Sequence, residues 1–295
     1  MRVKTISFPF SLALIVILSL SLVGPALSQG STTVTIQLAL VLDGSGSISS
    51  SDWSIIITGV ANAIRNNLPH DGTVEITVIQ FGYDEPEYAR VEVPPTVISN
   101  DTVAENVASQ VESIAQSGEM TPMAHSLYLA WQTVKGSPNF DPGLKQIINL
   151  ATDGEPNVRN NNATSDLDGD GDKNEYDDVI AVVNNAVAEG LDELDMEGIG
   201  IDDDARDWFR DYVLYPQPGH IAPPYTPGWI RVVADANEFA QTIGEKFQVI
   251  TTPYAVVGGV IVVRESKLLS SIPLLGLASA ILLATVISAI YLKVK

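Results

Sequence analysis

Cysteine is absent from this 295-residue chain, and histidine is scarce, with only His70, His125 and His220. The lack of cysteine excludes disulfide bonds, a thiol nucleophile and cysteine-ligated zinc or iron–sulfur centres. The wide spacing of the three histidines argues against a histidine-rich zinc site. Basic residues are also few, with 16 Lys and Arg against 36 Asp and Glu and a net charge of −20. We therefore expect no nucleic-acid binding, because phosphate neutralisation requires clustered Lys and Arg.

The N-terminal segment has the pattern of a secretory signal over residues 1–28. Arg2 and Lys4 precede an uncharged run over 5–28, which closes with a small-x-small triplet just before Gln29. This order of a basic start, an apolar stretch and a cleavage motif is typical of a cleavable signal peptide. An uncleaved N-terminal anchor is the alternative.

A second uncharged run occupies residues 272–292 near the C-terminus. Its 21 residues would span roughly 31 Å as a helix, which matches the hydrocarbon core of a bilayer. The tail 293–295 holds two lysines and is expected on the cytoplasmic side. We predict a single transmembrane helix, joined to the preceding domain by a stalk over 250–271.

The charge distribution sharpens this topology. No Asp or Glu lies in 1–28 or 266–295, so residues 29–265 hold all 36 acids and 11 of the bases, a net of −25. Basic ends and an acidic middle predict an acidic domain on the extracytoplasmic side of a cell membrane.

The middle of the chain alternates between strand and helix patterns. Apolar or alternating runs predict strands at 34–42, 74–81, 88–93, 144–152, 194–201 and 229–233. Helical spacing predicts helices at 52–68, 102–115, 122–135, 176–189, 205–214 and 237–249. The five prolines in 215–228 predict an irregular connection. This alternation indicates one α/β domain with a doubly wound, mostly parallel, Rossmann-like sheet.

The first predicted strand ends in the sequence DGSGS, which spans residues 43–47. A dinucleotide-binding fingerprint would need a further glycine where Ser49 stands. A nucleophile elbow and a Walker loop are likewise excluded by their missing Gly and Lys residues. What remains is a carboxylate and two hydroxyls, a set of hard oxygen ligands, at the carboxyl end of a strand where such sheets bind ligands.

Asp43, Ser45 and Ser47 together resemble the DxSxS signature of von Willebrand factor type A (vWA) domains, which include integrin I domains. The family supplies two further metal ligands later in its chain, and Thr121 and Asp153 stand at the corresponding places. The resemblance covers about residues 33–249. It implies a doubly wound α/β fold with a complete metal-ion-dependent adhesion site. The alternative is that the serines only cap the following helix.

The resemblance also implies a chemistry for this site. Mg²⁺ is the expected ion, with Mn²⁺ or Ca²⁺ left open, because oxygen ligands suit all three. Ser45 and Ser47 would bind it directly, and Asp43, Thr121 and Asp153 directly or through water. The open coordination position would accept an Asp or Glu carboxylate from a partner protein.

A second acidic segment lies at 159–178, where vWA domains connect the fourth strand to its helix. The resemblance implies that it is an insertion relative to that family. Asp166, Asp168 and Asp170 occupy relative positions 1, 3 and 5 of a calcium-loop pattern, Asp172 position 7 and Asp177 position 12. We expect this segment to bind Ca²⁺; a solvated acidic loop without an ion is the alternative.

These features favour a non-enzymatic, membrane-anchored adhesion module. A structural or assembly component of a surface complex is the alternative. A metal-dependent hydrolase is disfavoured, because only Glu119 and Glu155 are spare acids near the site and no histidine is well placed as a general base.

Overall fold

The structure, a computed structural model, describes residues 34–83, 86–157, 169 and 175–251, and the backbone of 254–257 and 260–263. Its main strands are β1 (Ile36–Asp43), β2 (Val74–Phe81), β3 (Ala89–Val97), β4 (Lys145–Thr152), β5 (Glu193–Ile199), β6 (His220–Ile221) and β7 (Trp229–Val233). They form one sheet in the order β3-β2-β1-β4-β5-β7-β6. Only the β2–β3 pair is antiparallel. The predicted α/β class with a mostly parallel sheet is confirmed.

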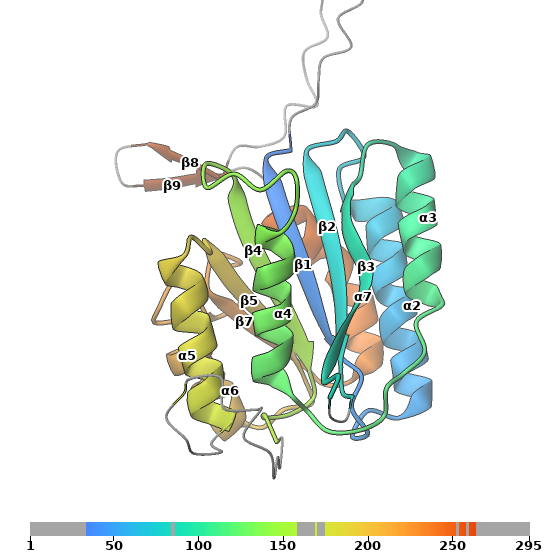
Figure 1. Ribbon diagram of the computed structural model, residues 1–295, viewed down its shortest axis with the longest axis vertical. Helices are drawn as coiled ribbons and strands as arrows, with labels where there is room; N and C mark the ends of the chain where they lie inside the picture. The colour runs from blue at the N-terminus through green and yellow to red at the C-terminus, as the bar shows by residue number, and fades with distance from the viewer. Residues whose placement is uncertain are drawn as a thin grey trace, which may run out of the picture. The chain divides into compact units, whose positions relative to one another are not determined.

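Helices cover both faces of the sheet (Figure 1). One face carries α2 (Ser50–Asn67), α3 (Asp101–Glu112) and α7 (Ala236–Ile250). The other carries α4 (Met123–Lys135), α5 (Glu175–Ala188), α6 (Asp203–Trp208) and the π-helical turn η2 (Phe209–Val213). The strands β8 (Tyr254–Val257) and β9 (Val260–Val263) pair separately as an antiparallel hairpin.

Strand β1 is covered on both faces of the sheet, which explains why its sequence is apolar at nearly every position. Leu38 and Leu40 belong to the core under α2, α3 and α7, whereas Ala39 and Val41 belong to the core under α4 and α5. Successive side chains of a strand point to opposite faces, so a strand covered on both sides needs apolar residues throughout. All eight residues of β1 are buried.

Most element boundaries agree with the sequence pattern within two or three residues, and β2 and β7 agree at both ends. Two strand segments differ, as does the helix described below. Strand β3 extends to Val97, because it continues to pair with β2 up to Glu75. The proline-rich connection 215–228 contains the two-residue strand β6, which pairs with β7 at the sheet edge.

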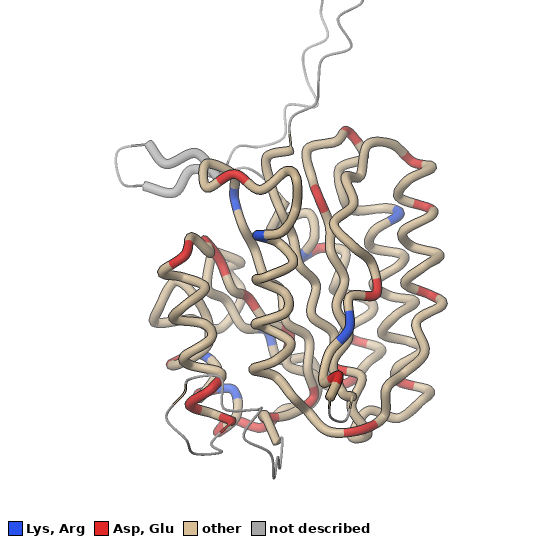
Figure 2. The backbone as a smooth tube through the Cα atoms, in the orientation of Figure 1, with Lys and Arg blue, Asp and Glu red and all other residues tan. Residues whose placement is uncertain are grey.

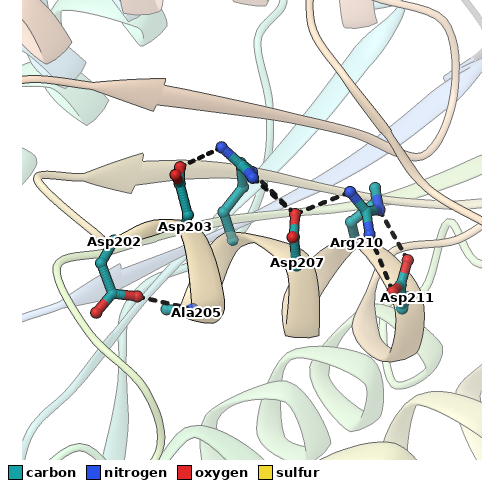
Figure 3. Close-up of polar contacts among 7 residues, drawn as sticks. Asp202, Asp203, Ala205, Asp207, Arg210 and Asp211 are labelled. Atoms are coloured by element: carbon teal, nitrogen blue, oxygen red, sulfur yellow. Dashed lines mark hydrogen bonds and ion pairs between the residues drawn. The ribbon is translucent and has the colours of Figure 1, made fainter.

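The helix expected at 205–214 is two elements, α6 and η2, and it carries a row of ion pairs (Figure 3). Asp202 caps its first turn by accepting a hydrogen bond from the Ala205 amide at 2.9 Å. Asp207 then lies between two arginines, 2.9 Å from Arg206 and 2.8 Å from Arg210. Solvent screens exposed pairs of this kind and they contribute little to stability, so the buried residues Phe209 and Val213 anchor the segment.

The expected signal segment 1–28 and transmembrane segment 272–292 lie outside the described residues. Within the part of the chain that the structure describes, no helix combines the length and apolar character needed to cross a bilayer.

Candidate functional site

Two neighbouring strands end side by side at the predicted site. β1 and β4 are parallel, and their register places Leu42 opposite Ala151. The chain turns that follow, at Asp43 and Asp153, therefore start from the same edge of the sheet. Because this alignment comes from strand pairing, it brings together residues that are 110 positions apart in the sequence.

A chain of hydrogen bonds joins four of the five predicted ligand residues. The Asp43 carboxylate accepts from the Ser45 amide at 2.9 Å. The hydroxyls of Ser45 and Ser47 are 3.0 Å apart, and Ser47 Oγ donates to Asp153 Oδ1 at 2.8 Å. Thr152 Oγ1 donates to the second Asp43 oxygen at 2.5 Å. Two carboxylates and two hydroxyls thus form one contiguous oxygen cluster.

Thr121, the fifth residue, lies in a loop that is bonded to both strand ends. The Gly118 amide donates to the Gly44 carbonyl at 2.8 Å, and the Gly46 amide donates to the Glu119 carbonyl at 2.8 Å. On the other side, the Thr121 amide donates to Asn157 Oδ1 at 2.9 Å. Thr121 itself is only 3% exposed. The loop before α4 is therefore held against the loops that carry Asp43 and Asp153.

The sequence pattern gave no indication of the residues that hold these loops in place. Gln80 of β2 accepts from the Ser117 amide at 2.9 Å, and Ser117 Oγ donates to the Gly44 carbonyl at 2.8 Å. Gln116 Nε2 donates to the Ser45 carbonyl at 3.1 Å and to the Ile48 carbonyl at 2.7 Å. The contacts of these amide and hydroxyl side chains in the folded structure reveal their role.

Gly46 is required by the close approach of two loops. A Cβ atom at this position would lie 2.7 Å from the Gly118 carbonyl oxygen, a backbone atom that cannot turn away as a side chain could. The glycine between Ser45 and Ser47 thus allows the hydroxyl-bearing loop to contact the loop of Thr121.

The first turn of α4 depends on a residue from α5. Pro122 provides no side-chain cap, and Glu175 Oε1 instead accepts from the Ala124 amide at 3.0 Å. Burial raises the pKa of Glu175 to about 8, and the nearby Asp178 adds to this shift. This long-range cap ties the start of α5 to the helix that follows Thr121.

The buried surroundings of the site disfavour the ionised form of both its carboxylates. Burial, with a smaller contribution from the charge of Asp153, raises the pKa of Asp43 to about 6, although hydrogen bonds from Ser45 and Thr152 oppose the shift. Burial also raises the pKa of Asp153, against its hydrogen bond from Ser47. A nearby cation would favour the ionised form of both groups.

The donor set fits a hard divalent cation. Carboxylate and hydroxyl oxygens are ligands for Mg²⁺, Mn²⁺ and Ca²⁺, and thiol or imidazole ligands are not part of this cluster. Among the described residues, no three His, Cys, Asp or Glu side chains gather as a metal-binding group. An ion here would therefore depend on the hydroxyls as well as on Asp43 and Asp153.

The predicted calcium loop is described only in part. Asp166, Asp168, Asp170 and Asp172 lie outside the described residues. Asp177 is exposed on the first turn of α5, and Gly169 has a positive φ of 79°. The two other acids considered near the site, Glu119 and Glu155, are exposed, and Glu155 accepts a hydrogen bond from Tyr176 at 2.8 Å.

Solved structures of adhesion and matrix proteins share this fold. A pilus adhesin, SpaC from Lactobacillus rhamnosus GG, aligns with a TM-score of 0.55 and 15% identity over 76% of this chain and 31% of its own. Proximal thread matrix protein 1 from the mussel byssus aligns with a TM-score of 0.53 and 13% identity over 76% of this chain and 50% of its own. Another structure of the mussel protein, with a zinc-occupied MIDAS motif, has a TM-score of 0.52 and 12% identity over 76% of this chain and 50% of its own.

These neighbours place the fold among vWA-like domains. Residues 33–252 match the family model described as "Protein of unknown function (DUF1194)", and the chain belongs to that family. No curated protein matches the chain. The matched region spans about a third of the pilus adhesin and half of the mussel protein. At these identities the likeness concerns the fold.

Proposed function

We propose that this domain is a binding module that holds a carboxylate of a partner protein through a divalent metal ion. The observation that carries the proposal is the hydrogen-bonded row from Asp43 through Ser45 and Ser47 to Asp153 at the edge of the sheet. The ion, Mg²⁺ in the first instance, would supply an electrophilic position for the incoming anion. Thr121 would complete the ligand set.

The protein's own residues have distinct roles in this proposal. Asp43 and Asp153 supply negative charge, and the serine hydroxyls supply neutral oxygens, so a divalent ion bound here would keep the ability to attract an anion. Thr152 orients the Asp43 carboxylate through its 2.5 Å hydrogen bond. Gln116 and Ser117 fix the backbone of the serine-bearing loop.

Replacement of one exposed hydroxyl tests the proposal. In Ser47→Ala, calorimetry on the full-length chain should show Mg²⁺ affinity reduced about tenfold or more, since losses of 10–100-fold are typical even for groups that only support a metal ligand. Thermal unfolding without metal should change little, because Ser47 is exposed.

Ser54→Ala is the matched control, because Ser54 is an exposed serine on α2 that bonds only its own helix, at the Ser50 carbonyl. Equal Mg²⁺ binding by wild type and both variants would refute a metal site at these hydroxyls. A pull-down from surface extracts that survives both EDTA and Asp153→Ala would refute the metal-bridged contact with a partner.

The acidic segment 159–178 is proposed as a second, calcium-binding element. Its support is the spacing of Asp166, Asp168 and Asp170 ahead of Asp177. The double variant Asp168→Ala/Asp170→Ala should lose one class of Ca²⁺ site in calorimetry and keep Mg²⁺ binding. Unchanged Ca²⁺ binding would refute this assignment.

A structural role in a surface assembly is the second candidate function. It is favoured by the likeness of the fold to a thread matrix protein as well as to an adhesin. Self-association of the purified chain without any partner, measured by sedimentation, would support this role over adhesion.

A further inference from the structure

A small pocket adjoins the proposed metal site. Its volume is about 200 Å³, and it lies among the loop after β1, the start of α2, the end of β5 and the start of α7. Ser47 and Asp153 line it as well as belonging to the oxygen cluster, so the pocket and the metal site share a wall. It is smaller than the roughly 300–1,000 Å³ of typical small-molecule sites, which suits a single side chain.

The pocket combines an apolar floor with an acidic rim. Ile48, Ile56 and Ile199 are all buried, with exposed fractions of 6%, 2% and 8%. Around them, the described lining residues include Asp52, Asp153 and Asp235 and no Lys or Arg. This combination matches the shape of a Lys or Arg side chain, which has an aliphatic stem and a cationic head.

One oxygen of each rim carboxylate accepts hydrogen bonds from groups nearby in the fold. Ser49 Oγ donates to Asp52 Oδ2 at 2.6 Å, and Asp235 Oδ1 accepts from the first amides of α7 at 2.9 and 3.0 Å. Asp153 Oδ1 accepts from Ser47. The second oxygen of each group takes no part in these bonds. The carboxylates are thus held in position while they still present charge at the pocket.

The arrangement of the acids argues for an organic cation over a second metal ion. Besides the three acids, the lining residues that the structure describes are isoleucines and alanines, with Ser47 as the one hydroxyl, so the wall offers few neutral oxygen ligands. A guanidinium or ammonium group has several donors and can satisfy carboxylates that are spread around a rim.

We infer that this pocket receives a Lys or Arg side chain of the partner, adjacent to the carboxylate that reaches the metal. This step rests on the proposed function, since it assigns both subsites to one partner. The recognised surface would therefore present an acidic and a basic side chain together, and the pocket would select among partners that all offer a carboxylate.

The pocket is tested first without divalent metal. Saturation-transfer difference NMR on the full-length chain uses propylguanidinium as the probe and propylurea as its neutral counterpart. Propylguanidinium should bind the wild type, more weakly as salt rises. In Asp52→Asn/Asp235→Asn its dissociation constant should rise about fivefold, as expected for the loss of two partly exposed charge pairs. Asparagine keeps the helix-capping oxygen at position 235.

The matched control is Asp71→Asn/Asp101→Asn, which removes two charges at the opposite end of the sheet, where β2 begins. It should bind the probe like wild type. Equal binding to wild type and to the pocket variant, or equal binding of propylurea, would overturn the inference. Divalent-ion binding that is lost in the pocket variant would overturn it in favour of a second metal site.

A second experiment joins the two subsites in the presence of Mg²⁺. Labelled Gly/Ser peptides carry one Glu and one Arg in varied spacing, and each has a twin with neutral citrulline in place of Arg. At least one spacing should bind about fivefold more tightly than its twin in fluorescence anisotropy, and only when Asp52 and Asp235 are intact. Mg²⁺-dependent binding without discrimination between the twins would refute the pocket and leave the proposed function standing. If propylguanidinium binds in the absence of metal but the chain does not bind Mg²⁺, the proposed function is refuted and the pocket stands.

Discussion

Asp43 is buried at the end of a central strand, where an ionised carboxylate without partners would be unfavourable. Hydrogen bonds from its neighbours offset part of this free-energy cost. Its oxygens accept from the Ser45 amide and from Thr152 Oγ1. Burial still raises its pKa to about 6. A buried carboxylate that retains this penalty is a candidate functional group, because metal binding would relieve it.

Gly46, the glycine between the two serines, allows two loops to approach each other closely. In Gly46→Ala the new Cβ must displace the Gly118 carbonyl, so the loop of Thr121 moves away from the serines. We expect Mg²⁺ affinity, measured by calorimetry, to fall about tenfold or more, as for other changes that misplace metal ligands.

Gly154→Ala is the control for this change, because a Cβ at Gly154 would have no atom within 4 Å although the residue follows Asp153 directly. It should bind Mg²⁺ like wild type. If both variants bind alike, the contact between the two loops does not determine the site.

Strand β5 and helix α7 are joined by charges that the core encloses. Glu193, Asp195 and Glu197 alternate along one face of β5, and each is fully buried. Asp195 accepts from the Gly228 and Trp229 amides at 2.8 and 3.0 Å, which fixes the start of β7. Burial and the adjacent Glu193 raise the pKa of Asp195 well above its usual range. The polar face of β5 thus organises the strand beside it.

A buried ion pair lies at the centre of this contact. Lys246 Nζ of α7 lies 3.2 Å from Glu197, and neither side chain is exposed. Burial lowers the pKa of Lys246 and raises that of Glu197. In Lys246→Met, Glu197 would be left as an unpaired buried carboxylate, so we expect the free energy of unfolding to fall by about 3–5 kcal/mol in denaturant titrations.

Two further variants complete this measurement. Adding Glu197→Gln to Lys246→Met should recover part of the loss, because the unpaired charge is removed. Lys135→Met breaks the surface pair with Glu189 and should lower the free energy of unfolding far less than Lys246→Met does, because solvent screens the surface pair. Equal losses for Lys246→Met and Lys135→Met would show that burial does not govern the strength of the inner pair.

At the scale of the whole molecule, acidic residues far outnumber basic ones over the described fold (Figure 2). Residues 153–207 alone contain 18 of the 36 acids and only three bases. This segment starts at Asp153, so much of the charge follows the strand that ends at the site. Some of these acids, such as Glu193, Asp195 and Glu197, are buried, and a divalent ion at the proposed site would offset part of the remaining charge.

We expect this acidic domain to lie on the extracytoplasmic side of a cell membrane. If residues 1–28 are a cleaved signal and 272–292 an anchor, mass spectrometry of the mature protein should find Gln29 at the N-terminus. Protease added to intact cells should digest the domain, whereas a tag fused after Lys295 should become accessible only after permeabilisation. A mature chain that retains residues 1–28, or a protected domain, would contradict the proposed topology.

The sequence by itself determined the class of the fold and the position of the candidate site along the chain. The mostly apolar sequence of β1 and the helical spacing after it predict a doubly covered parallel sheet, because burial on both faces leaves few polar positions. Asp43, Ser45 and Ser47 stand out as oxygen ligands at the end of the first predicted strand, and the resemblance to vWA domains adds Thr121 and Asp153. Both inferences depend on local order, which a sequence displays directly.

Only the tertiary structure decided which distant residues meet. The β1–β4 register brings Asp153 to Ser47, and Gln80, Gln116 and Ser117 hold the site's loops in place from other parts of the chain. The pocket rim joins Asp52 to Asp235, which are far apart in sequence. The sequence pattern likewise does not predict the buried Glu197–Lys246 pair, because charged residues usually indicate a solvated surface. Such contacts arise from strand order and helix packing, which local patterns of residues do not encode.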